Sequence, residues 1–207
     1  MQTGKMPLHR QVVPRRWPML PTMLVFEGGL AVVALMLGWI FGVSPVATWT
    51  WSLSAIGWGV LASVPLLVFF VCFERWPIGP LQEIRDFLSE HFLPLLLPMS
   101  TLDLFLISLS AGMGEEILFR GFVQSWAGDW FGTTWGLLLA SVLFGLAHMV
   151  TPTYAVVATV IGLLLGGLWL WTGNLLAPVV THTVYDFVAL VYMVTLTRQE
   201  LRTREVQ

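Results

Sequence analysis

Apolar residues run along most of the chain in long stretches, which short polar or proline-containing breaks separate. A helix that crosses the hydrocarbon core of a bilayer, about 30 Å thick, needs roughly 20 apolar residues. Each such stretch is expected to be helical, because lipid offers no partners for unpaired backbone groups. Six stretches meet this demand: Met19–Val43, Trp51–Phe73, Thr101–Val123, Phe131–Val150, Tyr154–Thr172 and Leu175–Thr197.

The segment Pro80–Leu93 has a different pattern. Its apolar side chains recur at the spacing of one helix face, and polar side chains fill the opposite face. The apolar positions are Leu81, Ile84, Leu88 and Phe92, and the polar ones are Gln82, Glu83, Arg85, Asp86, Ser89 and Glu90. We expect an amphipathic helix lying in the plane of the membrane interface. The predicted fold is therefore an all-α, polytopic membrane helix bundle with about six transmembrane helices and one interfacial helix.

The composition agrees with lipid as the main partner of this chain. Hydrophobic residues make up 57% of it and charged residues only 11%, whereas soluble domains carry roughly 25% charged residues. The net charge of -2 gives no indication of a nucleic-acid partner. Lysine and arginine gather in the N-terminal tail, after the second stretch and in the C-terminal tail, which predicts that both termini face the cytoplasm. We expect a multi-pass protein of the cell (inner or cytoplasmic) membrane.

Ionisable side chains within the apolar stretches point to a functional site. Each costs about 2.5–3.5 kcal/mol at the centre of a membrane helix, so such residues are rarely without a role. Glu27 stands alone in the first stretch. Nearly all the others lie in the third, fourth and sixth stretches: Glu115, Glu116, Arg120, His148, His182 and Asp186. A purely structural role does not explain two histidines and an extra carboxylate on three helices.

The spacing of these residues predicts how they pair. Glu116 and Arg120 are four residues apart, so they share a helix face and can form an ion pair that offsets the burial of both charges. Glu115 is rotated by about 100° from its neighbour and is free to face another helix. Asp186 follows His182 by four residues and can accept a hydrogen bond from one nitrogen of its ring.

Three motifs in this region carry a family resemblance. They are Glu115-Glu116-x-x-x-Arg120, Phe144-x-x-x-His148 and His182-x-x-x-Asp186. In this order and on separate helices they resemble the CPBP family of intramembrane proteases. That family includes the type 2 CAAX prenyl proteases and Abi-like bacterial proteins linked to bacteriocin processing and self-immunity. The resemblance covers about Leu102 to Val191.

The resemblance implies a role for each residue. Glu115 and His148 would activate a water, and His182 and Asp186 would stabilise the oxyanion of the tetrahedral intermediate. The family has asparagine or aspartate at the last position, and an ionised aspartate cannot donate a hydrogen bond. Asp186 is therefore expected either to be protonated or to orient His182. The implied supporting residues are Glu116, Arg120 and Phe144, of which Phe144 either shapes the pocket or only packs.

Cofactor and function follow from the same resemblance. We favour a glutamate mechanism without a cofactor, and the alternative is zinc held by Glu115, His148, His182 and Asp186. The expected activity is that of an intramembrane endopeptidase acting on a peptide or a membrane-anchored protein. The alternatives are a non-catalytic membrane immunity or binding protein, and an ion- or proton-coupled transporter. The predicted parts are residues 1–100 with the tail, two transmembrane helices and the interfacial helix, 101–197 with the catalytic bundle, and 198–207 with a cytoplasmic tail.

Two points stay open in the sequence. Counted along straight helices, His148 lies on the order of 10 Å from the depth of Glu115, which a break near Thr151–Pro152 or a shifted boundary would correct. Glu27 is interpreted as structural, either protonated or bonded to a polar group on a helix that approaches at Gly28 and Gly29. In that interpretation Glu27→Gln is tolerated and Glu27→Leu destabilises the fold. The other interpretation makes Glu27 a gate or a substrate contact.

Overall fold

Helices account for nearly all of the described chain. A computed structural model describes residues 16–76 and 78–205, and no strand occurs in these ranges. The positively charged residues Lys5, Arg10 and Arg15 lie outside them. In order along the chain, the helical elements are α1 (Arg16–Phe41), α2 (Leu53–Arg75), α3 (Pro80–Phe87), η2 (Leu88–Phe92), α4 (Leu93–Leu96), α5 (Thr101–Glu116), η3 (Ile117–Gln124), α6 (Ser125–Phe131), α7 (Thr133–Ala147), α8 (Pro152–Thr172) and α9 (Leu176–Glu205).

The prediction of a helical membrane bundle is confirmed, with four or five spans by length and composition where about six were expected. Among the described residues, four helices are long and apolar enough to cross a membrane: α1 from Met19, α2, α8 and α9 as far as Thr203. A fifth span results if the pair Pro80–Leu96 and Thr101–Phe131, bent by 117°, counts as one. The predicted fourth span is shorter than expected, because α7 has 15 residues. At about 1.5 Å per residue it is about 22 Å long.

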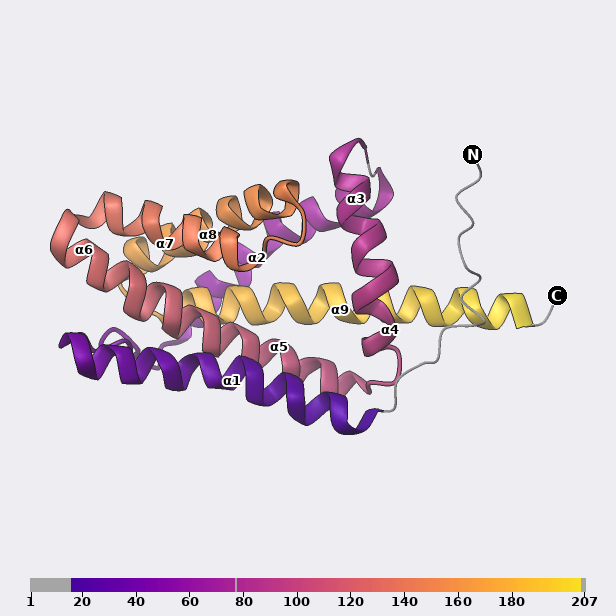
Figure 1. Cartoon of the computed structure of the whole chain (residues 1–207), viewed down its shortest axis with the longest axis horizontal. Helices are drawn as coiled ribbons and strands as arrows, with labels where there is room; N and C mark the ends of the chain where they lie inside the picture. The colour runs from indigo at the N-terminus through magenta and orange to yellow at the C-terminus, as the bar shows by residue number, and fades with distance from the viewer. Residues whose placement is uncertain (1–15, 77, 206–207) are drawn as a thin grey trace.

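The predicted amphipathic helix is present as α3, η2 and α4. It runs across the direction of α5 and α9 (Figure 1), in agreement with a position in the interface plane. Ile84 on its apolar face is buried in a cluster with Phe70 and Phe73 of α2. Arg198 of α9 donates hydrogen bonds to the carbonyl oxygens of Leu97 (2.7 Å) and Met99 (2.6 Å). These bonds satisfy carbonyls at the end of α4 that have no partner within the helix.

The ends of the described chain lie together. α1 begins and α9 finishes at the same end of the bundle (Figure 1). The segment predicted as a C-terminal tail from residue 198 is helical, since α9 continues to Glu205. The crosswise α3–α4 segment also lies toward this end.

The outer faces of the long helices are apolar and exposed. In the spanning windows only 11% to 33% of residues are buried inside the protein. Val25 and Trp39 of α1, for example, are 74% and 87% exposed. Such surfaces are stable where lipid rather than water surrounds them.

Close helix packing depends on glycines of α5. A Cβ atom at Gly112 would collide with Thr183 of α9, and one at Gly114 would collide with the backbone oxygen of Glu27 on α1. Small residues of this kind let membrane helices approach to backbone contact. The close approach to α1 thus comes from α5 and not, as predicted, from Gly28 and Gly29, since a Cβ at Gly29 would meet nothing within 4 Å. Both α1 and α9 are brought against the turn of α5 that carries Glu115.

Candidate active site

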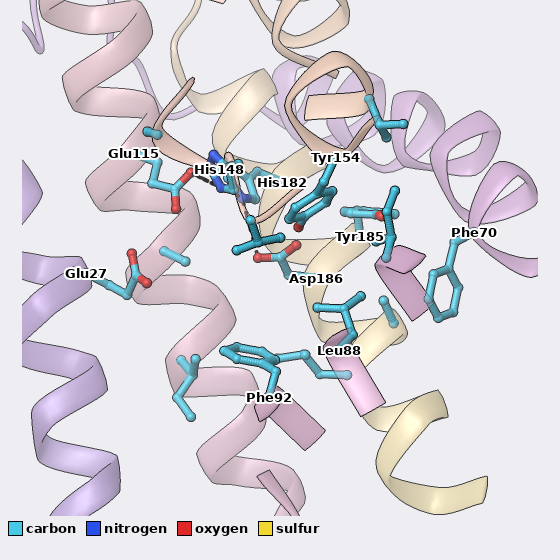
Figure 2. Close-up of a pocket in the computed structure, with 18 of the residues that line it drawn as sticks. Glu27, Phe70, Leu88, Phe92, Glu115, His148, Tyr154, His182, Tyr185 and Asp186 are labelled. Atoms are coloured by element: carbon cyan, nitrogen blue, oxygen red, sulfur yellow. Dashed lines mark ion pairs between the residues drawn. The ribbon is translucent and has the colours of Figure 1, made fainter. Parts of the chain in front are cut away.

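A cavity of about 690 Å³ lies between the crosswise segment and the bundle. One part of its wall is apolar and includes Phe70 and Phe73 of α2 and Leu88 of η2. The other part gathers ionisable and phenolic side chains that lie far apart in the sequence. Figure 2 shows them facing the same space: Glu27, Glu115, His148, Tyr154, His182 and Asp186. An apolar cavity with a few convergent polar groups is typical of a binding or catalytic site.

Glu115 lies at the centre of the polar wall. Its Oε2 atom is 3.6 Å from Nε2 of His148 and 4.0 Å from Nε2 of His182. This oxygen is buried and has no hydrogen-bond partner among the described residues. The two separations exceed hydrogen-bond length, so groups in this arrangement can share a bridging water. The structure thus brings together three of the predicted residues from three separate helices.

The backbone fixes the ring of His148. His148 directly follows the last residue of α7, and its Nδ1 lies 2.8 Å from the carbonyl oxygen of Phe144. A carbonyl only accepts, so Nδ1 carries the hydrogen, and the neutral ring presents the lone pair of Nε2 toward Glu115. α7 ends three residues before the predicted boundary at Val150, since Pro152 starts the next helix. Nε2 of His148 lies 3.6 Å from Oε2 of Glu115, so the offset expected from straight helices is absent.

His182 is held from behind by the Glu116–Arg120 pair. Its Nδ1 lies 2.8 Å from Oε1 of Glu116, which also accepts a 2.8 Å hydrogen bond from Nη1 of Arg120. The predicted ion pair is confirmed. Its carboxylate has a second task, because it fixes the hydrogen on Nδ1 and turns Nε2 of His182 into the cavity. Asp186, expected either to be protonated or to orient His182, faces the other nitrogen of this ring, with Oδ2 3.4 Å from Nε2.

Arg120 and Phe144 form the layer behind the histidines. Arg120 is 1% exposed, and its Nη2 also donates to the carbonyl oxygen of Gly162 at 3.1 Å. The guanidinium lies 4.5 Å from the centre of the Phe144 ring, which in turn is 4.5 Å from the ring of His148. Phe144 is 3% exposed and packs between these groups. Of its two predicted roles, the structure therefore favours packing.

A widened helical turn follows the two glutamates. η3 is a π-helical segment that begins at Ile117, directly after Glu116. Such segments are rare within α-helices and frequently mark functional sites. Here the widened turns carry Arg120 to its contacts with α8, while Glu115 stays on the cavity wall. No feature of the sequence analysis predicted this irregularity.

Glu27 lies on the cavity wall, although the family motifs do not include it. Its Oε2 is buried and has no hydrogen-bond partner among the described residues, so the predicted polar partner on a neighbouring helix is not found. Tyr154 was missed altogether by sequence reasoning. The sequence could have indicated it, because Tyr154 follows His148 by six residues and lies in the first turn of the next helix, α8. A residue at the start of that helix lies at the same level of the bundle as the end of α7.

A zinc site does not fit the residues as they lie. Within the described chain, no group of three or more histidine, cysteine, aspartate or glutamate side chains is arranged to hold a metal ion.

Glutamate and histidine side chains from separate parts of the chain thus converge on one cavity of the helical bundle. Residues 97–188 match the family model described as type II CAAX prenyl endopeptidase Rce1-like. The chain is 33% identical over 133 residues to the uncharacterized protein YpbD of Bacillus subtilis (strain 168), an alignment that covers 64% of this chain and 66% of YpbD. No solved structure matches the chain. The match over residues 97–188 confirms the resemblance to this family that the motifs carry.

Proposed function

We propose that the chain is an intramembrane endopeptidase that hydrolyses a peptide bond with a water activated by Glu115 and His148. The single observation that carries this proposal is the convergence on Glu115 Oε2 of Nε2 from His148 and His182, at 3.6 Å and 4.0 Å. The match of residues 97–188 to a family described as endopeptidases supports the same reaction.

The reaction begins with a water between Glu115 and His148. The unprotonated Nε2 of His148 or the carboxylate of Glu115 takes a proton from the water as its oxygen attacks the carbonyl carbon of the peptide bond. The carbonyl oxygen becomes an oxyanion. When the intermediate collapses, the C–N bond breaks and its electron pair stays on nitrogen, which receives the proton taken from the water. The step is balanced without an oxidant, a reductant or a metal.

The Glu116–Arg120 pair acts through His182 in this scheme. Glu116 accepts the hydrogen on Nδ1 of His182, so Nε2 alone faces the substrate. A protonated Nε2 donates to the oxyanion. Glu116 and Arg120 are positioning residues, since their charged groups pair with each other behind the ring.

The cavity wall supports a substrate with an apolar part. Phe70, Phe73 and Leu88 offer an apolar surface opposite the polar residues. We propose a peptide or a membrane-anchored protein as the substrate, cleaved near the cytoplasmic surface of the cell membrane. The crosswise amphipathic helix, which lines the cavity through Ile84, supports cleavage close to the interface.

Comparative proteomics of membranes tests the proposal. Cells carrying wild type, Glu115→Ala or Asp129→Asn are compared by labelling the new N-termini of membrane proteins. Asp129 is exposed on α6, away from the cavity, so its variant is the matched control for loss of an acid. We expect at least one protein to accumulate uncleaved only in Glu115→Ala cells. Identical N-termini in all three would contradict proteolysis, and a proton leak that depends on Glu115 would instead favour a transporter.

A further inference from the structure

The proposed reaction needs hydrogen-bond donors for the oxyanion, and the motif residues supply few. Nδ1 of His182 is engaged by Glu116. Its Nε2 faces two acidic acceptors, Asp186 Oδ2 at 3.4 Å and Glu115 Oε2 at 4.0 Å. An ionised aspartate accepts hydrogen bonds and donates none. The oxyanion would therefore gain from a second hydrogen-bond donor that carries no charge.

The first turn of α8 holds a phenol at this place. Tyr154 lies in the turn that begins with Pro152, and its backbone N–H donates to Oγ1 of the capping residue Thr151 at 3.1 Å. A proline at the first helical position and a side-chain cap both fix the start of a helix. The backbone that carries Tyr154 is thus held next to His148 by local interactions.

Packing fixes the ring as well. The Tyr154 ring meets the His148 ring edge to face, with centroids 6.1 Å apart and an angle of 86° between the planes. The Tyr154 side chain also packs against the apolar cluster of Phe70, Phe73 and Ile84. A ring that these contacts hold presents its hydroxyl in one direction, which is the condition for a preorganised donor.

The hydroxyl faces the reacting groups. Tyr154 lines the cavity, and Figure 2 shows its hydroxyl directed toward Asp186. Among the described residues the hydroxyl has no hydrogen-bond partner. A buried phenol usually has one, so a hydroxyl without a partner on a cavity wall is available to a bound substrate.

We propose that Tyr154 is a further catalytic residue, whose hydroxyl donates a hydrogen bond to the oxyanion formed at the substrate carbonyl. This inference rests on the proposed function. The phenol keeps its proton throughout: as the water oxygen bonds to carbon, the carbonyl π electrons move to oxygen, and the O–H group stabilises the charge that develops there. The nitrogen of the leaving amine still takes its proton from Glu115 or His148.

The other tyrosines of the chain provide the comparison. Tyr185 also lines the cavity, but its ring packs edge to face against Phe70 at 6.5 Å. Tyr192 is not on the cavity wall and packs against Phe70 at 5.6 Å. Tyr192→Phe removes the same hydroxyl from the same helix bundle, so it is the matched control for Tyr154→Phe.

Kinetics and binding of a transition-state mimic test the assignment. The probes are an internally quenched peptide spanning the cleavage site mapped by the membrane comparison, and the same peptide with a phosphonate in place of the scissile amide. Loss of one oxyanion donor lowers kcat by about 10²–10³-fold. We expect this loss for Tyr154→Phe with an unchanged KM, a matching loss of affinity for the phosphonate, and wild-type behaviour for Tyr192→Phe.

Other results overturn the assignment. Unchanged kcat in Tyr154→Phe, or equal weakening of phosphonate and peptide binding, would reduce Tyr154 to packing. Should Tyr154→Phe fold poorly by thermal unfolding in detergent, trifluorotyrosine at position 154 replaces it. Its more acidic phenol should move the alkaline loss of activity to lower pH, and an unmoved pH profile refutes the donor role. Wild-type enzyme that neither cleaves the peptide nor prefers the phosphonate would refute the proposed function itself.

Discussion

Glu115 and Glu116 are neighbours of the same residue type, yet their carboxylates have different partners. Glu116 is fully buried and pairs through one oxygen with both Arg120 and His182 at 2.8 Å. Glu115 faces the cavity, and its Oε2 has histidine nitrogens no closer than 3.6 Å. A rotation of about 100° between successive helical residues separates the two environments.

This difference separates a fixed carboxylate from an available one. Buried charges are stable where they are paired, so Glu116 has little freedom to bind anything else. Both carboxylates keep a buried Oε2 without a hydrogen-bond partner among the described residues, but only Glu115 lies on the cavity wall, where a water or a substrate can bind it. The pair thus shows how one turn of helix can supply both the support and the reactive group of a site.

The largest expected effect is on catalysis at Glu115 and His148. Glu115→Gln and His148→Ala should each lower turnover by about 10²–10⁴-fold, the usual contribution of a general acid or base. Neither side chain makes a hydrogen bond that joins two helices, so the temperature of unfolding in detergent should stay that of the wild type. Near-normal turnover of His148→Ala would remove it from the activation of water.

The second effect should be on stability at Glu116 and Arg120. Removing either partner leaves a buried charge uncompensated, so Glu116→Ala and Arg120→Ala should each lower the free energy of unfolding by about 3–5 kcal/mol. The double variant should lose less than the sum of the two, because both single changes break one interaction. Strict additivity in equilibrium unfolding of all four proteins would contradict the ion pair.

The third effect concerns the contact that places α1 against the site. An alanine Cβ at Gly114 would collide with the backbone oxygen of Glu27, so Gly114→Ala should destabilise the protein by about 1–3 kcal/mol, as overpacking does. Gly29→Ala is the matched control, because its Cβ meets nothing within 4 Å and alanine favours a helix by about 1 kcal/mol. Thermal unfolding of both variants in detergent checks that Gly114→Ala is less stable than Gly29→Ala.

A smaller effect is expected at Glu27. Its buried Oε2 has no partner among the described residues, so replacing the carboxylate with an apolar side chain should raise the free energy of unfolding by about 1 kcal/mol. This prediction is the opposite of the one from the sequence, in which Glu27→Leu destabilises the fold. Glu27→Gln, which keeps a polar group at the same place, should change stability less. Loss of stability in Glu27→Leu would indicate a structural hydrogen bond.

The smallest expected effect is that of metal removal. The glutamate mechanism routes no step through a metal, so purified enzyme treated with 1,10-phenanthroline should keep its turnover of the quenched peptide. Loss of activity that added Zn²⁺ restores would replace this mechanism with the zinc alternative on Glu115, His148, His182 and Asp186.

The apolar stretches predicted the helices, and the ionisable residues within them predicted the site. The contacts between these residues were harder to predict from the sequence. Buried Glu116 and Arg120 were recognisable because four-residue spacing alone brings them together. Glu116 could not be recognised as the partner of His182, because a contact between α5 and α9 depends on tertiary packing. The number of membrane spans could not be predicted for a similar reason. A run of apolar residues does not reveal that α7 ends at His148 or that α4 turns sharply into α5.

The length of α7 has a consequence for the bilayer around the protein. A helix of about 22 Å is shorter than a hydrocarbon layer of about 30 Å, and lipids next to such a helix thin locally to match it. His148 lies where this helix stops, so the thinned lipid brings the aqueous boundary toward its ring. Hydrophobic mismatch on one flank of the bundle thereby gives water a short route to His148. Activity in vesicles should accordingly fall as the acyl chains of the host lipid lengthen.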